Sequence, residues 1–446
     1  MTHEKLDLHL FNSCSLNQLA GLEFSCSCAK EHAVSTKSIS FGSSILDNLD
    51  AVLQNFLPSL SSVLVLTDSV VRDKTARMLE KAVARFKYRI SLHEFKEQPF
   101  GSVDECEAIE MVEDCKGVIG IGGPQVLELA KYLGARYSLP MGAILTSYDT
   151  IRVLSPSALL FRDGIEETFK VESPQFLFCD TDFLCSNNDK ELAGAFGSLA
   201  SKVVSLFDYN AAKIITKEPF CSCIKNIGNS LIDTLIKTFD ASDNDNDFKI
   251  KLAESGLRFG VLMQLVGSTR LMAGGESQAG HVAKILFKHE ERDLLYRGEY
   301  EMILSRIVLS IYQRFLGQNQ QFFTPPPDNN MRLEQIEEFL GLTQSVSIKK
   351  LRIIPETKKL DLQSYRLGEY RADLFSAVSL DLARLDRAYS VFKRLYDDDG
   401  FNLKNALDES STALAVALGA DLKDKFTLLS HLKDLGLLDE YVKELL

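Results

Sequence analysis

Two short runs of this sequence carry residue types that could do chemistry. In the first, a strand-like stretch ends in glycines and an amphipathic helix follows at once, and it reads Gly117-Val118-Ile119-Gly120-Ile121-Gly122-Gly123-Pro124-Gln125. Glycines let the backbone turn tightly and approach a ligand, and the first amides of the next helix then face whatever lies above the turn. This order predicts that Gly120, Gly122 and Gly123 bind a dinucleotide pyrophosphate, and the alternative is a turn that only packs. In the first case, Gly122→Val should block binding and leave the fold intact.

The second run lies near the N-terminus and holds Cys26, Cys28 and His32. Thiolates and imidazole are the ligands that zinc prefers, so these residues could supply three positions of a zinc site. Cys221 and Cys223 could complete that site if the fold brings them close. The alternative is a short strand with reduced, half-buried thiols, because Cys-x-Cys is a less specific signal than paired Cys-x-x-Cys.

The first half of the chain alternates strand and helix patterns. Apolar runs at residues 62–67, 88–93, 117–122 and 140–146 indicate strands, and periodic segments at 71–86 and 103–113 indicate helices. Buried strands alternating with helices favour a parallel, doubly wound sheet, in which ligands bind beyond the carboxyl ends of the strands.

Three of the expected strands carry candidate cofactor-binding residues at those ends. They are Asp68, Gly122 with Gly123, and Thr146 with Ser147. An acidic side chain at Asp68 could hydrogen-bond a ribose and favour NAD over NADP. The alternative is an Asp that only caps the helix after the strand.

Helical periodicity dominates from about Asp189 onward. The expected helices lie at 193–207, 226–239, 248–273, 299–316, 331–342, 372–395 and 422–446. We therefore predict two domains: an α/β dinucleotide-binding domain with an N-terminal extension over residues 1–188, and an all-α domain over residues 189–446.

Composition narrows the functional classes. The chain has 446 residues, 45% of them hydrophobic, and a formal net charge of -12, which argues against general binding to nucleic acid or anionic lipid. No apolar run is long enough for a bilayer span, and the first residues do not resemble a secretory signal. Nine cysteines, an odd number spread over a long chain, favour reduced thiols and a cytoplasmic location.

Several segments, in order along the chain, resemble motifs of one dehydrogenase family. The run from Phe24 to His32 resembles its Cys-x-Cys-Gly-x-x-His segment, and the glycine turn resembles its Gly-Gly-Gly-x-x-x-Asp turn, with Glu128 for the Asp. Residues 172–180, 268–281 and 424–429 resemble three further motifs. The chain is thus similar to the glycerol-1-phosphate dehydrogenases, of the dehydroquinate-synthase-like and iron-containing alcohol dehydrogenase superfamily. The resemblance implies the dehydroquinate-synthase-like fold.

The resemblance also implies an activity. Members of that family interconvert dihydroxyacetone phosphate and sn-glycerol 1-phosphate with NAD(H) or NADP(H), and a zinc or similar ion polarises the carbonyl. The family's metal ligands, one Asp and two His, correspond here to Ser198, Ser277 and Arg297. Hydroxyls are poor zinc ligands and a guanidinium cannot coordinate a metal. We therefore expect no metal at these positions and expect Arg297 to supply the fixed positive charge, unless it is a solvated residue at a helix end.

Lys202 and His281 match other positions of the family and are, with Arg297, the candidate catalytic residues. His281 is alternatively a packed core histidine. The leading function is an oxidoreductase of this family, acting on a small phosphorylated metabolite. One alternative is a metal-independent enzyme in which Lys202 or Arg297 holds a phosphate and His281 transfers protons. Another is a non-catalytic ligand-binding or scaffold protein, and a homo-oligomer is possible in each case.

Overall fold

A computed structural model describes most of the chain and divides it into two compact units. The described residues are 4–28, 30–45, 49–57, 61–69, 89–96, 99, 101–163, 165–185, 191–241, 245–289, 296–318, 329–342, 355–397, 407–422 and 425–445. The first unit comprises Met1–Arg162, Glu166–Glu191 and Lys237–Thr269, and the second Asp163–Ile165, Leu192–Ile236 and Arg270–Leu446. The helix expected at residues 71–86 lies outside the described residues.

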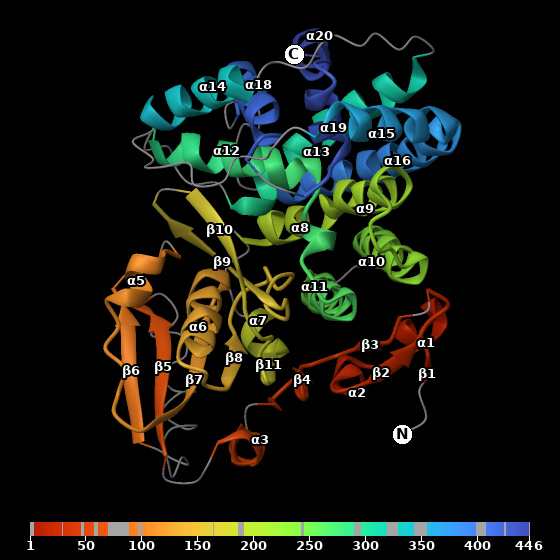
Figure 1. Ribbon diagram of the computed structural model, residues 1–446. Coiled ribbons are helices and arrows are strands. Elements are labelled where there is room, and N and C mark those ends of the chain that lie inside the picture. The colour runs from red at the N-terminus through yellow and green to blue at the C-terminus, as the bar shows by residue number, and fades with distance from the viewer. Residues whose placement is uncertain are drawn as a thin grey trace. The chain divides into compact units, whose positions relative to one another are not determined.

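A six-stranded sheet forms the centre of the first unit (Figure 1). Its strand order is β4-β11-β8-β7-β5-β6, and every neighbouring pair runs parallel. The strands are β4 (Ser38–Gly42), β5 (Ser62–Asp68), β6 (Arg89–Phe95), β7 (Cys115–Gly122), β8 (Met141–Leu145) and β11 (Phe176–Asp180). The predicted parallel sheet is therefore confirmed.

The two faces of β7 are covered by different helices because side chains alternate along a strand. Ile119 and Ile121 lie in an apolar core that also contains Leu49 and Leu53 of helix α3 (Leu49–Phe56). The intervening glycines face helix α6 (Pro124–Arg136), which starts directly after the strand. Four of the six strands are almost wholly buried, as expected when helices cover both faces of a parallel sheet.

Smaller elements surround this sheet. A three-stranded sheet of order β1-β2-β3 forms near the N-terminus, and β9 and β10 form a two-stranded sheet. The strands are β1 (Glu4–Lys5), β2 (Glu23–Ser25), β3 (His32–Ala33), β9 (Ser157–Arg162) and β10 (Ile165–Lys170). The helices are α1 (Leu8–Ser13), α2 (Leu16–Leu19), α5 (Val103–Glu107), α7 (Thr181–Cys185) and α11 (Asp245–Val266).

Helix α11 lies far along the sequence but belongs to the first unit. Its Arg258 donates hydrogen bonds to the carbonyl oxygens of Phe11 (2.9 Å) and Cys14 (2.7 Å). Its Gln264 accepts from the amides of Ser35 (2.8 Å) and Thr36 (3.1 Å). Helix α11 thus satisfies backbone groups at the end of α1 and just after β3.

The second unit is built of helices, as predicted. They are α8 (Leu192–Ala200), α9 (Lys202–Thr216), α10 (Ser222–Ala241, of which the residues from Lys237 on belong to the first unit), the short 3-10 helix η3 (Arg270–Met272), α12 (Gly275–His289), α13 (Arg297–Gly317), α14 (Asn329–Leu342), α15 (Thr357–Glu369), α16 (Arg371–Asp397), α18 (Glu409–Gly419), α19 (Leu428–Asp434) and α20 (Leu438–Leu445). None of the described helices combines the length and apolar character needed to cross a bilayer. The domain boundary after residue 188 stays a prediction.

A buried carboxylate joins four helices of this unit. Asp208 on α9 accepts hydrogen bonds from the first amides of α12 (Gly275, 2.9 Å) and α19 (Leu428, 2.8 Å). It also accepts from the hydroxyl of Tyr312 on α13, at 3.1 Å. That hydroxyl in turn accepts from the Leu429 amide, at 3.0 Å. Because the first amides of a helix have no partner within it, one Asp–Tyr pair satisfies two helix N-termini.

Burial raises the pKa of Asp208 to about 7, against the opposing effects of the Leu428 and Gly275 amides and of Arg270. The corresponding pKa in an unfolded chain is about 3.9. Between these values the folded protein holds a proton that the unfolded chain has released. The stabilisation that comes from this proton is therefore complete below about pH 4 and is lost as the pH rises through about 7.

We expect Asp208→Ala to lower the free energy of unfolding by about 3–5 kcal/mol, because two buried amides and one hydroxyl lose their acceptor. Asp208→Asn keeps one acceptor oxygen and should cost less. Denaturant unfolding of the three proteins measures both effects. The difference between wild type and Asp208→Asn should fall from pH 4 to pH 7, since only the wild type titrates there. Equal destabilisation by the two substitutions, independent of pH, would contradict this role.

Candidate functional site

The glycine turn lies at the carboxyl edge of the parallel sheet, as predicted. Strand β7 ends at Gly122 and Pro124 begins α6, so Gly123 is the N-cap, with no side-chain hydrogen bond to the helix. The turn lies beside the end of β8, because the Thr146 amide donates to the Gly122 carbonyl at 3.2 Å. A Cβ atom on Gly123 would lie 3.6 Å from Ser147 Cβ, an ordinary contact. The structure therefore brings together four of the predicted cofactor-binding residues.

Two of the three predicted glycines have a packing reason to be glycine. A Cβ atom on Gly122 would lie 2.8 Å from Val126 Cβ, and one on Gly120 would lie 2.9 Å from Ala130 Cβ. Both contacts are with α6 and both are too short for carbon atoms. Gly120 and Gly122 therefore let the helix sit close to the strand. The expectation that Gly122→Val leaves the fold intact is wrong, because any side chain there displaces α6.

Asp68 is the last residue of β5 and is buried, with 3% exposure. It lies at the same edge as the glycine turn, because β5 and β7 are parallel neighbours. Most of the segment that follows Asp68 is outside the described residues, so ribose binding and helix capping both stay open as its role. The hydroxyl of Ser147, at the same edge, donates a hydrogen bond to a carboxylate oxygen of Glu191 at 2.8 Å.

Glu128 on α6 has structural contacts. One of its oxygens pairs with Lys131 (3.1 Å) and Arg152 (3.3 Å), and the other accepts from the Leu159 amide (2.7 Å). Burial lowers the pKa of Lys131 to about 8, although Glu128 acts in the opposite direction. These bonds tie α6 to the segment that leads into β9. The role of Glu128 in cofactor binding stays a prediction, and its contacts favour a structural one.

A second candidate site lies among the helices of the second unit. Lys202 Nζ, at the start of α9, pairs with Glu276 Oε1 of α12 at 3.2 Å and with Glu301 Oε2 of α13 at 2.7 Å. The other oxygen of Glu301 pairs with Arg297 Nε at 2.7 Å. The side chains of Lys202 and both glutamates are at most 1% exposed, and that of Arg297 is 16% exposed. Two predicted catalytic residues thus share one carboxylate.

The two glutamates differ in their proton affinity. Burial raises the pKa of Glu301, but the charges of Lys202 and Arg297 outweigh it and hold the pKa at about 2. Burial likewise raises the pKa of Glu276, and there the opposing effect of Lys202 is not enough. Among the described residues, Glu276 Oε2 has no hydrogen-bond partner. Glu276 is therefore the member of the cluster best suited to hold a proton.

The three positions that correspond to the family's metal ligands lie on the helices of this cluster. Ser198 on α8 lies against the start of α13, since a Cβ atom on Gly298 would be 2.7 Å from Ser198 Oγ. Gly298 directly follows Arg297. Ser277 is the neighbour of Glu276 in the first turn of α12, and the buried His281 lies about one turn further along.

These residues do not fit a divalent metal ion. They offer two hydroxyls and a guanidinium that is already paired with Glu301. A hydroxyl is a weak ligand beside imidazole or carboxylate, and the positive charge of Arg297 opposes that of a metal ion. Arg297 is the first residue of α13, and only 16% of its side chain is exposed, so it is a helix-end residue that is largely buried. That it holds an anion stays a prediction.

Sequence reasoning missed the two glutamates that organise this cluster. Glu276 lies inside the motif that led to Ser277 and His281, and Glu301 lies four residues after Arg297. The i,i+4 spacing of Arg297 and Glu301 on an expected helix was the available signal for an ion pair. The pairing of both glutamates with Lys202 had no such signal, because it joins three separate helices.

Comparison with known proteins finds similar sequences among the iron-containing alcohol dehydrogenases. The sequence profile of the iron-containing alcohol dehydrogenases matches residues 40–186. A glycerol-1-phosphate dehydrogenase [NAD(P)+] of Halalkalibacterium halodurans is 23% identical over 290 residues, which cover 62% of this chain and 68% of that protein. The Geobacillus thermodenitrificans protein of the same name is 23% identical over 208 residues, 46% of this chain and 51% of its own length. Against the latter, the alignment thus spans about half of the relative.

Solved structures agree on the fold. An archaeal halo-thermophilic alcohol dehydrogenase from a Red Sea brine pool superposes with a TM-score of 0.57 at 12% identity, covering 93% of this chain and 98% of that one. An iron-containing alcohol dehydrogenase from Corynebacterium glutamicum gives a TM-score of 0.53 at 16% identity, covering 92% and 96%. A sheet domain followed by a helical one is the architecture common to them.

Rebuilding the family's ligand set should create a metal site. We expect Ser198→Asp, Ser277→His and Arg297→His together to bind zinc, because they supply one carboxylate and two imidazoles and remove the opposing charge. All proteins compared also carry Cys26→Ser and Cys28→Ser, so that thiols near the N-terminus do not contribute to the metal content. Elemental analysis after dialysis measures the ion, with Arg297→His alone as the control. A stoichiometric metal ion in the protein with only the two cysteine substitutions would contradict the conclusion that Ser198, Ser277 and Arg297 do not fit a metal ion.

Proposed function

We propose that this chain, which is similar to the glycerol-1-phosphate dehydrogenases of the iron-containing alcohol dehydrogenase superfamily, binds NAD(H) or NADP(H) at the glycine turn and interconverts dihydroxyacetone phosphate and sn-glycerol 1-phosphate. The observation that carries this proposal is the glycine turn at the carboxyl edge of β7, with Thr146 and Ser147 beside it. The alcohol-dehydrogenase-like fold supports the reaction class, and the family resemblance supports the substrate.

In this reaction a hydride from the reduced nicotinamide forms a bond to the carbonyl carbon, and a proton adds to the carbonyl oxygen. In the family a metal ion stabilises the developing oxyanion, but the residues at that position here do not fit one. Arg297 is the cation of the cluster with the greater exposure, so it is the one we assign to a phosphate or carbonyl oxygen. Lys202 is fully buried between two carboxylates, and its role is to hold Glu276 and Glu301 in place.

Further parts of the proposal rest on single features. An acidic Asp68 at the end of β5 supports NAD over NADP, because a carboxylate accepts from a ribose hydroxyl and repels a ribose phosphate. None of the nine cysteines forms a disulfide, which supports a reducing, cytoplasmic location. A phosphorylated metabolite and a second copy of the chain are the partners that we propose.

A second candidate function follows from the Arg297–Glu301 ion pair at 2.7 Å. A fixed cation at the position of the catalytic metal can hold an anion without promoting hydride transfer. The chain would then be a dinucleotide- or metabolite-binding protein that has kept the fold. NADH fluorescence and turnover of dihydroxyacetone phosphate, measured on one sample, separate the candidates: binding with turnover supports the first, and binding without turnover supports the second.

Gly123 offers a direct test of the dinucleotide site. We expect Gly123→Asp to weaken NADH binding at least about tenfold, because a carboxylate at the N-cap repels the pyrophosphate. The same substitution should leave the melting temperature unchanged or raise it, since Asp is a good N-cap residue and the added Cβ has room. Gly123→Asn is the matched neutral control. If both variants bind NADH as the wild type does, the turn is not the cofactor site.

Arg297 can be tested in the same way. A charge-assisted hydrogen bond contributes roughly 1.5–3 kcal/mol, so Arg297→Ala should weaken binding of dihydroxyacetone phosphate by about tenfold to a hundredfold. Arg297→Lys keeps the positive charge but not the planar set of donors of the guanidinium, so it should lose less binding affinity than Arg297→Ala. Calorimetric titration measures affinity, and thermal unfolding confirms that each variant is folded. Unchanged affinity of Arg297→Ala would remove Arg297 from the site.

A further inference from the structure

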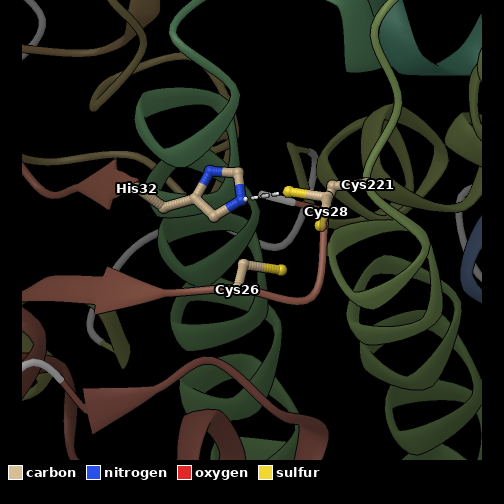
Figure 2. Close-up of side chains that lie close together, drawn as sticks. All are labelled: Cys26, Cys28, His32 and Cys221. Carbon is tan, nitrogen blue, oxygen red and sulfur yellow. Dashed lines mark hydrogen bonds between the residues drawn. The ribbon is translucent and has the colours of Figure 1, made fainter. Parts of the chain in front are cut away.

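The N-terminal sheet brings three metal-ligating side chains together. Strand β2 ends at Ser25, and the chain turns back so that β3 begins with His32, antiparallel to β2. Cys26 and Cys28 lie in the connection. Cys28 Sγ is 3.2 Å from His32 Nε2, and the ligand atoms of these three residues all lie within 4.8 Å of one another. Figure 2 shows the side chains of Cys26, Cys28 and His32 converging.

A hydrogen bond fixes the orientation of the histidine ring. His32 is buried, with 3% exposure, and its Nδ1 lies 2.6 Å from the carbonyl oxygen of Leu265 on α11. Because a carbonyl only accepts, Nδ1 must carry the proton, and the lone pair of the neutral ring is then on Nε2, the atom that faces Cys28. A carbonyl that orients the far nitrogen of an imidazole is the usual support of a metal-bound histidine.

The surrounding backbone is held by the same helix. The side-chain oxygen of Gln264 on α11 accepts hydrogen bonds from the amides of Ser35 and Thr36, just beyond β3. Its side-chain nitrogen donates to the Thr36 hydroxyl at 2.9 Å. The connection from Cys26 to His32 is therefore anchored at its end by a rigid element. A site held in this way is ordered before a ligand arrives.

We propose that Cys26, Cys28 and His32 are ligands of a zinc ion. Two thiolates and one imidazole are ligands for which zinc outcompetes calcium and magnesium. The expectation that Cys221 or Cys223 completes the site stays a prediction, because both belong to the second unit. This ion is separate from the metal of the family's catalytic site, whose ligand positions are all in the second unit.

The zinc ion would have a structural role. Strands β2 and β3 are only three and two residues long, so backbone pairing alone stabilises them little. Binding of a metal to preformed ligands adds directly to the stability of the segment that carries them. We therefore expect removal of zinc to loosen the N-terminal segment from α11 and to lower the thermal stability of the whole chain.

Elemental analysis of the full-length protein, purified without a tag and dialysed against metal-free buffer, tests the proposal. We expect close to one zinc ion per chain, and less than about a tenth of that after Cys26→Ser, Cys28→Ser or His32→Ala. Cys14→Ser is the matched control, since Cys14 is a partly buried thiol of the same unit, outside the cluster, and should keep the zinc. Wild-type protein without zinc that also fails to bind added zinc at micromolar concentration would overturn the proposal, as would variants that keep the ion.

Cobalt substitution tests the set of ligands, because thiolate-to-cobalt charge-transfer absorption grows with the number of sulfur ligands. Wild type loaded with cobalt should show this absorption, and Cys26→Ser and Cys28→Ser should each lose most of it. Absorption unchanged by both substitutions would overturn the assignment of these two thiolates as ligands. A chelator should lower the melting temperature of wild type but not of the Cys26→Ser variant. Because the readouts are metal content, absorption and melting, their failure is independent of the proposed dehydrogenase activity.

Discussion

The structure of the helical unit depends on the ion pairs and hydrogen bonds that stabilise its buried charged side chains. Lys202, Glu276 and Glu301 are almost fully buried, and each would be costly alone, since an unpaired buried charge destabilises a protein by several kcal/mol. Their mutual pairing requires the start of α9, the first turn of α12 and the first turns of α13 to meet. Asp208 adds a second such requirement, because its carboxylate accepts hydrogen bonds from the N-terminal amides of α12 and α19. Helix positions here are set by polar geometry as much as by apolar burial.

This constraint gives the cluster of Lys202, Glu276, Arg297 and Glu301 a defined shape. In a metal-dependent relative, an ion would gather side chains from several helices. Here Glu301 gathers Lys202 and Arg297 by charge, and the contact of Gly298 with Ser198 brings α8 and α13 together. The ion-pair cluster therefore connects these helices through charge. It offers no open coordination position, so in the proposed reaction Arg297 would stabilise the oxyanion through hydrogen bonds.

The sequence predicted those features that follow from local patterns. The parallel sheet follows from buried apolar runs such as that of β5, and the glycine turn from its place between β7 and α6. Interactions between distant segments were not predictable. Glu128 matched a cofactor position in the motif, but its bonds to Arg152 and Leu159 depend on how a later segment folds back. Helix α11 was expected with the helical domain, but it belongs to the first unit, where it makes polar contacts with residues such as Phe11 and Ser35.

The close approach of α6 to β7 has a consequence for how glycine motifs are interpreted over evolutionary time. Gly120 and Gly122 are required by the helix, whether or not a ligand is ever bound. A lineage that stopped using a dinucleotide would still keep these two positions, since replacing either one damages the fold. Gly123 is under no such packing demand and is free to drift once the ligand is lost. Among the three glycines, the residue at the N-cap is therefore the one whose identity would change when cofactor binding is lost. Gly120 and Gly122 reflect only the packing of the helix on the sheet.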